Sequence, residues 1–251
     1  MTAVHTFLLV AGLVTGVPDV LRQTPSMSVG RDTEIQFKLV GTERLPTAKG
    51  RVLVADTRHG RTVTVKLHGM RPASLFGGDF NTYVLWIVGE AGRVRNVGEV
   101  ELTGRHAELS FTTDLDRFGI LISAEPHYLV DSPSRFVVVE LADKRTEPIS
   151  YRGTEGSYAY ERDSLEATTP ATGAVETAVP QAMTAVRLAQ RSRPGACAAG
   201  ALLDAEKSLE ATLSLIARNS ERQEIEASAR QTVRLAVSAQ TLGRSCAPRN
   251  R

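Results

Sequence analysis

The sequence predicts an α+β protein built as separate domains: an N-terminal Ig-like antiparallel β-sandwich, followed by a C-terminal helical hairpin or three-helix bundle. Apolar and polar residues alternate through the first part of the chain, which is typical of strands with one buried face. After about Pro180 the apolar residues recur every three or four positions, which is typical of amphipathic helices. The change of period lies near residue 145. It predicts a β-sandwich over 30–145, a linker over 146–179, a helical domain over 180–243 and a tail over 244–251.

Composition is typical of a globular protein, with 42% hydrophobic and 23% charged residues among 251. The formal net charge is only +2, and basic residues are interspersed with carboxylates. Binding to a phosphate backbone requires a concentrated basic footprint. We therefore expect no nucleic-acid partner.

An apolar run precedes the first expected strand, from Thr6 to Val17. It is too short to cross a bilayer as a helix, but it fits the core of a signal peptide, with Val14 and Gly16 as small residues for cleavage. Residues 1–16 are therefore predicted to be a signal peptide of an exported protein whose mature chain has no transmembrane span. Only His5 precedes the run, so a misplaced start or a buried segment is the alternative.

Alternation is clearest in two segments of the expected sandwich. One side of each segment carries only apolar residues: Ile35, Phe37 and Leu39 in the first, and Val63, Val65 and Leu67 in the second. Residues 58–60 and 103–105 contain glycine and are expected to form tight hairpins. The second hairpin is expected to join residues 97–102 with residues 107–111.

Residues 82–88 have no polar face, which predicts a central strand covered on both sides. Residues 118–123 and 136–141 are expected to be similar but shorter strands. The predicted core contains Trp86, Tyr83, Leu85 and Phe118, with Trp86 as the central plug. An exposed Trp86 that stacks on a sugar is the alternative. Seven or eight short strands with glycine-rich turns and no helices between them favour a sandwich.

Several of these segments carry a resemblance: residues 81–86 (NTYVLW), 96–99 (NVGE), 118–126 (FGILISAEP) and 133–140. Over about residues 50–141 the chain resembles the extracytoplasmic domain of anti-sigma-K factors. The resemblance implies a sandwich outside the cytoplasm. It also implies an alternative function, that of a regulatory relative of these factors that lacks their membrane anchor.

Three helices are expected in the second half, over about 180–193, 198–219 and 220–243. Pro180 suits a first helical turn, and the Ser220 hydroxyl can cap the third helix while Gln223 reaches back. Three segments resemble an uncharacterised family of small bacterial envelope helical proteins often found beside OmpA-like domains: 185–189 (AVRLA), 202–209 (LLDAEKSL) and 229–236 (ARQTVRLA). Self-association through these helices is an expected partner mode.

The chain has two cysteines, Cys197 before the second expected helix and Cys246 after the third. In an antiparallel hairpin that turns near Ser220, residues pair when their numbers average about 220, and this pair does so. A disulfide between Cys197 and Cys246 is therefore predicted, since exported proteins occupy oxidising compartments. Two unpaired, partly buried thiols are the alternative.

The sequence contains no diagnostic catalytic or metal motif, so no cofactor or metal is predicted. The five histidines lack metal-ligand spacing. Carboxylates at expected turns, Asp79, Asp114, Asp116 and Glu125, are expected to be solvated capping residues. We expect a non-enzymatic exported envelope protein whose sandwich binds a protein or cell-wall component and whose helices serve packing or assembly. A hydrolase that uses carboxylates on sandwich loops is a further alternative.

Overall fold

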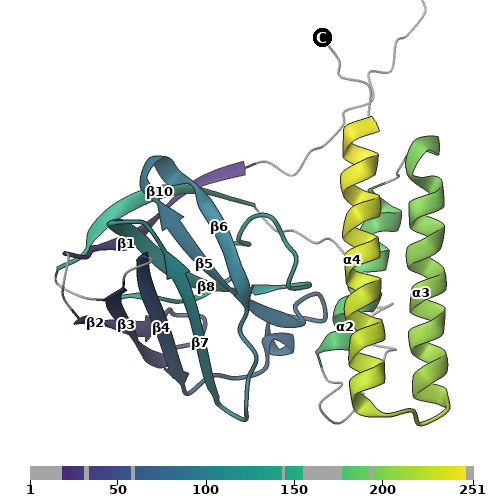
Figure 1. Ribbon diagram of the computed structural model, residues 1–251, viewed down its shortest axis with the longest axis horizontal. Coiled ribbons are helices and arrows are strands. Elements are labelled where there is room, and N and C mark those ends of the chain that lie inside the picture. The colour runs from purple at the N-terminus through teal and green to yellow at the C-terminus, as the bar shows by residue number, and fades with distance from the viewer. Residues whose placement is uncertain are drawn as a thin grey trace, which may run out of the picture.

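The computed structural model describes residues 19–30, 34–57, 60–142, 145–154, 177–192 and 195–246. The strands precede the helices in the sequence. The β-domain and the three helices lie side by side in space (Figure 1). The strands are β1 (Asp19–Ser28), β2 (Glu34–Gly41), β3 (Lys49–Thr57), β4 (Gly60–His68), β5 (Thr82–Gly89), β6 (Val94–Glu99), β7 (His106–Thr113), β8 (Arg117–Glu125), β9 (Val137–Leu141) and β10 (Glu147–Thr154). The helices are α2 (Ala178–Arg191), α3 (Ala199–Ala217) and α4 (Arg222–Cys246). The predicted signal peptide lies outside the described residues.

The strands form one mostly antiparallel sheet that curls into a nearly closed barrel (Figure 1). Its order is β10-β1-β8-β9-β2-β3-β4-β7, and β5 pairs with both β8 and β6. An Ig-like sandwich has two separate sheets, whereas hydrogen bonds here join the strands into one. The fold is therefore α+β, and the Ig-like sandwich is not confirmed.

The main core fills the barrel with the apolar side of each alternating strand. In β4, Val63, Val65 and Leu67 are buried, while Lys66 on the opposite side is half-buried. This is the pattern expected of a sheet with one face against the core and one toward water. The two faces of β2, β3, β4 and β7 therefore have different chemistry.

Strand β5 is buried on both faces. Tyr83 and Leu85 face the main core together with Phe118 of β8, and all three are at most 1% exposed. Trp86 is also fully buried, but it lies in a second, smaller core on the opposite face of the sheet, where Tyr151 of β10 covers it. The prediction that Trp86 plugs the main core is therefore wrong about its location.

Strands β1 and β10 were missed by the predicted domain boundaries. The sandwich was expected to begin at residue 30 and the linker to cover residues 146–179, yet β1 and β10 pair along eight residues. Their sequences are polar and each contains a proline; Pro25 and Pro148 lie opposite one another in the register. Proline is uncommon within strands, so neither sequence gives a clear signal for one.

The turn at residues 103–105 forms, but the hairpin predicted around it does not. Thr103 and His106 make an isolated antiparallel bridge, and Gly104 has a φ of +61°. Beyond that bridge β6 pairs with β5 and β7 pairs with β4. At the other predicted turn, residues 58 and 59 lie outside the described residues, and the flanking Thr57 and Gly60 lie opposite each other.

The helices form a small bundle in which α3 and α2 both pack against α4. Its core is rich in alanine, and two threonines, Thr212 and Thr232, are also fully buried. Their hydroxyls hydrogen-bond each other (3.2 Å) and those of Ser228 and Ser208 (2.8 Å each), so the α3–α4 contact is partly polar. No described helix is long and apolar enough to cross a membrane.

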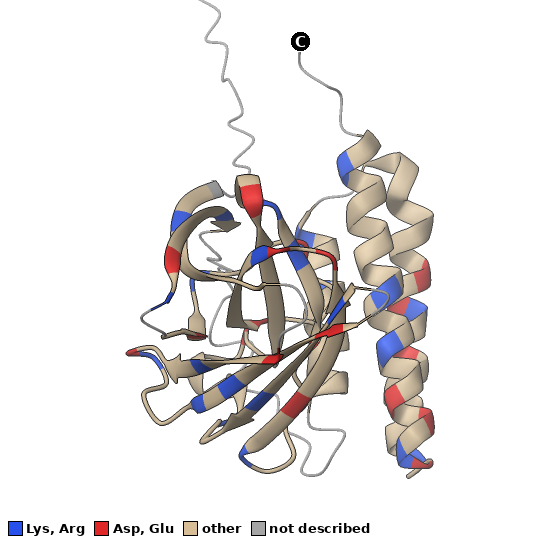
Figure 2. Cartoon of the chain, turned by 60° about the vertical axis from the view of Figure 1, so that its left-hand side comes forward, with Lys and Arg blue, Asp and Glu red and all other residues tan. Residues whose placement is uncertain are grey.

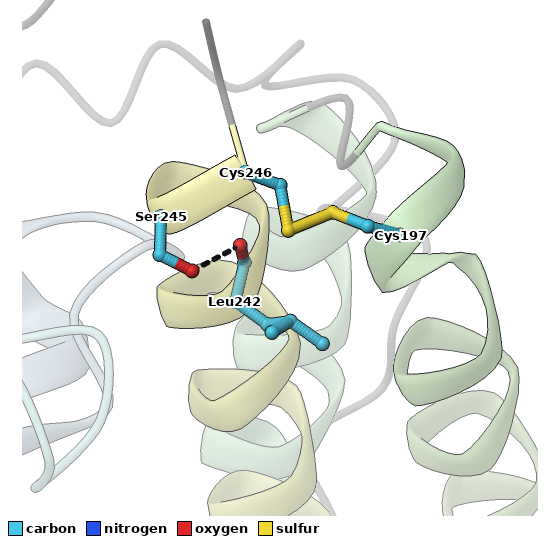
Figure 3. Close-up of a disulfide and its surroundings, with 4 residues drawn as sticks. All are labelled: Cys197, Leu242, Ser245 and Cys246. Carbon is cyan, nitrogen blue, oxygen red and sulfur yellow. Dashed lines mark hydrogen bonds between the residues drawn. A yellow bond between two sulfur atoms is a disulfide. The ribbon is translucent and has the colours of Figure 1, made fainter. Parts of the chain in front are cut away.

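A disulfide joins Cys197, in the turn before α3, to Cys246 at the end of α4 (Figure 3). The two Cα atoms are 6.5 Å apart, within the range that a disulfide spans. Helix α4 continues to Cys246, three residues beyond the predicted end of the helical domain. The bond therefore fastens the open end of the α3–α4 hairpin.

Candidate functional site

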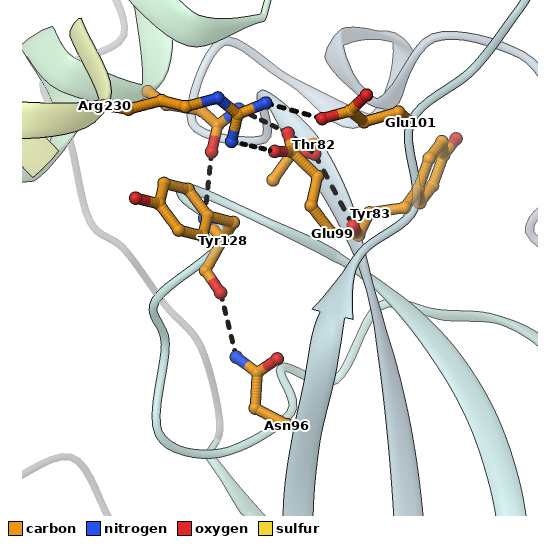
Figure 4. Close-up of polar contacts among 8 residues, drawn as sticks. Thr82, Tyr83, Asn96, Glu99, Glu101, Tyr128 and Arg230 are labelled. Atoms are coloured by element: carbon orange, nitrogen blue, oxygen red, sulfur yellow. Dashed lines mark hydrogen bonds and ion pairs between the residues drawn. The ribbon is translucent and has the colours of Figure 1, made fainter. Parts of the chain in front are cut away.

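The junction between barrel and helices is built around one buried carboxylate (Figure 4). Glu99, at the end of β6, has a side chain that is 6% exposed. It accepts hydrogen bonds from Thr82 Oγ1 of β5 and Gln181 Nε2 of α2, each at 2.7 Å. Arg230 Nη1 of α4 lies 2.7 Å from its other oxygen. A carboxylate removed from water needs such donors, and here three elements supply them.

Arg230 extends this cluster onto the barrel surface. Its second terminal nitrogen lies 2.6 Å from Glu101, and its guanidinium lies 5.2 Å from the centre of the Tyr128 ring. Burial opposes the charge of Arg230, but the hydrogen bond and charge of Glu99, together with Glu101, outweigh it and raise the pKa of Arg230. The guanidinium therefore stays charged.

The loop after β8 is held against α2 by amides. Asn81 Nδ2 donates to the carbonyl of Pro126 (2.9 Å) and to Thr184 Oγ1 (3.0 Å). Gln181 Oε1 accepts from the backbone N–H of Tyr128 at 2.9 Å. The same glutamine therefore connects the loop and Glu99. The side-chain amides of Asn81 and Gln181 thus have hydrogen-bond partners in both the barrel and α2. These bonds hold α2 against the barrel.

Removing the cation at the junction should destabilise the protein. In Arg230→Leu, Glu99 stays buried without its ion pair. Because Arg230 is itself 30% exposed, solvent screens the pair, and we expect a loss of about 1–3 kcal/mol in the free energy of unfolding. Urea denaturation measures it. Arg222→Leu, at an exposed position of the same helix, is the control and should change stability by less than about 0.5 kcal/mol. Equal effects of both variants would contradict the buried-pair interpretation.

A second buried carboxylate lies inside the β-domain. Glu125 is fully buried and accepts hydrogen bonds from Ser123 Oγ (2.5 Å) and the backbone N–H of Ser134 (2.7 Å). Ser123 Oγ in turn accepts from Trp86 Nε1 at 2.7 Å. The prediction that Glu125 is a solvated capping residue is therefore wrong. Its hydrogen bonds orient Trp86 and the loop after β8.

His127 is 3% exposed, and its Nδ1 atom is buried with no hydrogen-bond partner among the described residues. Burial lowers the pKa of His127 from 6.5 to about 4, although the charge of Asp131 acts in the opposite direction. His127 adjoins Tyr128 in the loop held by α2. A proton on this imidazole would therefore be costly in the folded protein.

Stability should accordingly fall in mild acid. Below pH 6.5 the unfolded chain takes up a proton at His127, while the folded chain does so only below about pH 4. This contribution is complete above pH 6.5 and is lost progressively as the pH falls to 4, by about 3 kcal/mol in all. Urea denaturation between pH 7 and pH 4 should show a shallower decline in His127→Gln. The exposed control His68→Gln should keep the wild-type decline, and identical slopes in all three proteins would contradict the assignment.

The outer face of the sheet carries a row of cations. Lys38 of β2 lies opposite Arg51 of β3, which lies opposite Lys66 of β4. Figure 2 shows basic residues side by side on adjacent strands at the lower left of the barrel. Lys66 also pairs with Glu108 of β7 at 2.9 Å. Neighbouring strands are about 5 Å apart, so these charges lie close together.

An open hollow of about 910 Å³ lies over the same strands. Its lining has mixed charge, because Arg51 and Lys66 lie beside Glu101 and Glu108. His68 and His106, which face each other across β4 and β7, also line it. We call the surface formed by Lys38, Arg51, Lys66, His68 and His106 the basic sheet face. Within the described part of the chain, no group of three or more His, Cys, Asp or Glu residues is placed to hold a metal ion.

Comparisons with protein-family models, curated proteins and solved structures found no match. The resemblances to anti-sigma-K factors and to envelope helical proteins therefore stay predictions. The basic sheet face was missed from the sequence. Its signal was available, because Lys38 and Lys66 occupy the polar positions of alternating strands. Alternation does not give the strand register, which places Lys38 and Lys66 in one row with Arg51.

Proposed function

We propose that this chain is a non-enzymatic, exported cell-envelope protein that binds an anionic protein or cell-wall component through its β-domain. The observation that carries the proposal is the row of Lys38, Arg51 and Lys66 on neighbouring strands of the basic sheet face. Most of its side chains are directed to solvent, because the opposite face of the same strands fills the barrel core. Clustered charge of one sign favours association with a partner of the opposite sign.

Export is supported by the disulfide between Cys197 and Cys246. Structural disulfides persist in oxidising compartments and are rare in the cytosol. The apolar run at residues 6–17 agrees with this localisation. Both features belong to a protein that works outside the cytoplasm.

The helical domain is proposed to serve packing and assembly. Its contact with the barrel is polar and specific, through Glu99, Gln181 and Arg230. Helix α3 packs against α4 and also contacts α2, and it exposes Leu203 (48%) and Leu213 (43%). In this arrangement the helices buttress one end of the barrel and leave the basic sheet face uncovered.

A charge reversal on the basic sheet face should weaken binding to isolated cell envelopes. In Lys38→Glu/Arg51→Glu, two exposed cations become anions, and we expect at least a tenfold loss in co-sedimentation affinity, as well as a weaker dependence on salt. The control is Lys207→Glu/Arg222→Glu, which makes the same change of charge on the helices. Melting temperatures of both variants verify folding.

Three outcomes decide the proposal. Loss of binding only in the sheet variant supports it. Equal loss in both variants would mean that net charge alone governs binding, and binding at the wild-type level in the sheet variant would mean that the partner lies elsewhere. Either of the last two results would overturn the assigned surface.

A further inference from the structure

Residues 126–131 form a loop after β8 that contributes to two hydrophobic cores. Tyr128 and Leu129 pack on the core of the helical bundle, whereas Val130 packs on the smaller core of the β-domain. Asn96 of β6 donates hydrogen bonds to the carbonyls of Tyr128 and Val130, each at 2.9 Å (Figure 4). The loop therefore links the barrel to the helices through its side chains as well as its backbone.

His127 lies where this loop meets α2. The carbonyl before it, that of Pro126, accepts a hydrogen bond from Asn81 Nδ2, which also bonds a threonine hydroxyl of α2. The N–H after it, that of Tyr128, donates to Gln181 Oε1 of α2 at 2.9 Å. The backbone is thus held on both sides of an imidazole that is 3% exposed. Closure of the loop against α2 therefore keeps His127 in a buried position.

Charged groups at this junction come from the loop and from four neighbouring elements: Asp131 in the loop, Glu125 of β8, Glu99 of β6, Arg187 of α2, and Arg230 and Arg244 of α4. Asp131 pairs with Arg244 at 2.9 Å, and the other two carboxylates have the partners described above. Arg187 Nη1 is buried with no hydrogen-bond partner among the described residues. Asp131 alone favours a proton on His127 by its charge, and burial outweighs it.

We propose that the loop over residues 126–131 is an acid-sensitive latch, in which protonation of His127 releases the loop from α2 and exposes Tyr128 and Leu129. In the open form the imidazole reaches water and takes up a proton below pH 6.5, whereas in the closed form it does so only below about pH 4. Closure is therefore favoured fully above pH 6.5, and this preference is lost as the pH falls toward 4. The latch belongs to the junction and does not depend on the proposed binding surface.

Hydrogen exchange of the full chain tests the latch through the Tyr128 amide, whose bond to Gln181 exists only in the closed loop. The two protonation ranges of His127 predict that the protection factor of this amide falls about twentyfold between pH 7 and pH 5. In His127→Gln the same factor should change by less than about twofold, because glutamine does not titrate. The exposed control His68→Gln should keep the wild-type fall.

Urea distinguishes the opening of this loop from unfolding of the whole protein. The free energy of an opening reaction falls with urea in proportion to the surface that it exposes. In wild type at pH 5, 1 M urea should change the exchange rate of the Tyr128 amide by less than about twofold. The amide of Val65, in the main core, should exchange at least about fivefold faster in 1 M urea.

The two wild-type measurements decide the proposal without any variant. A Tyr128 amide whose protection is the same at pH 7 and pH 5 overturns the latch, and so does one that responds to urea as strongly as the amide of Val65. A pH response that persists in His127→Gln rejects His127 as the group that opens the loop. Loss of the response in this variant alone supports the proposal.

Discussion

Trp86→Ala is expected to lower the free energy of unfolding by about 3–5 kcal/mol. Trp86 is fully buried between β5 and the strands that cover it, with Val84, Val88, Leu121 and Tyr151 in the same cluster. Truncation would leave a large cavity. It would also remove the indole N–H from Ser123, which is hydrogen-bonded to the buried Glu125.

Urea denaturation measures this loss, and Leu75→Ala is the control. Leu75 is 60% exposed, so its truncation should change stability by less than about 0.5 kcal/mol. The sequence left open an exposed Trp86 that stacks on a sugar. A Trp86→Ala protein with wild-type stability and lost ligand binding would support that alternative and contradict the buried position.

Breaking the disulfide is expected to have an effect of similar size. Cys197 and Cys246 are 49 residues apart, and the loss of a cross-link over a loop of this length costs about 4 kcal/mol in the chain-entropy model. The Cys197→Ser/Cys246→Ser protein should therefore unfold at lower urea concentration. Because the bond holds the ends of α3 and α4, separation of these helices should come first.

Reduction provides the matched comparison for this prediction. Wild type treated with dithiothreitol should become as unstable as the double serine variant, and the variant should not respond to the reductant. Two free thiols titrated in denatured, unreduced native protein would show that the bond is absent. That result would also remove the main physical support for export.

The helical half could be predicted closely because its signals are local. Pro180 lies in the first turn of α2, Gly195 follows its end, and Ser220 precedes α4. The apolar period between these positions is that of a helix. By contrast, β1 and β10 could not be recognised. A proline interrupts each of them, and they are defined by pairing with each other and, for β1, with β8.

Strand pairing also could not be predicted from the sequence. The turn around Gly104 was predictable from glycine alone. The strands on either side of the turn, β6 and β7, do not pair with each other, because β6 pairs with β5 and β7 pairs with β4. A local turn signal therefore does not determine a hairpin.

The junction could not be predicted for a similar reason. Glu99 meets Gln181 and Arg230 across 82 and 131 residues of sequence. Each residue alone resembles an ordinary surface residue. The basic sheet face could be predicted in part. The alternation of each strand shows which residues face outward, but it does not show how they align across strands.

Hydrogen exchange of the full chain, with and without isolated cell envelopes, tests the proposed binding surface most directly. If the basic sheet face binds the partner, amides in residues 34–41, 49–57, 60–68 and 106–113 should become more protected, while those of α3 should not change. Protection confined to α3 and α4, with no change in these strands, would contradict the assignment of binding to the β-domain.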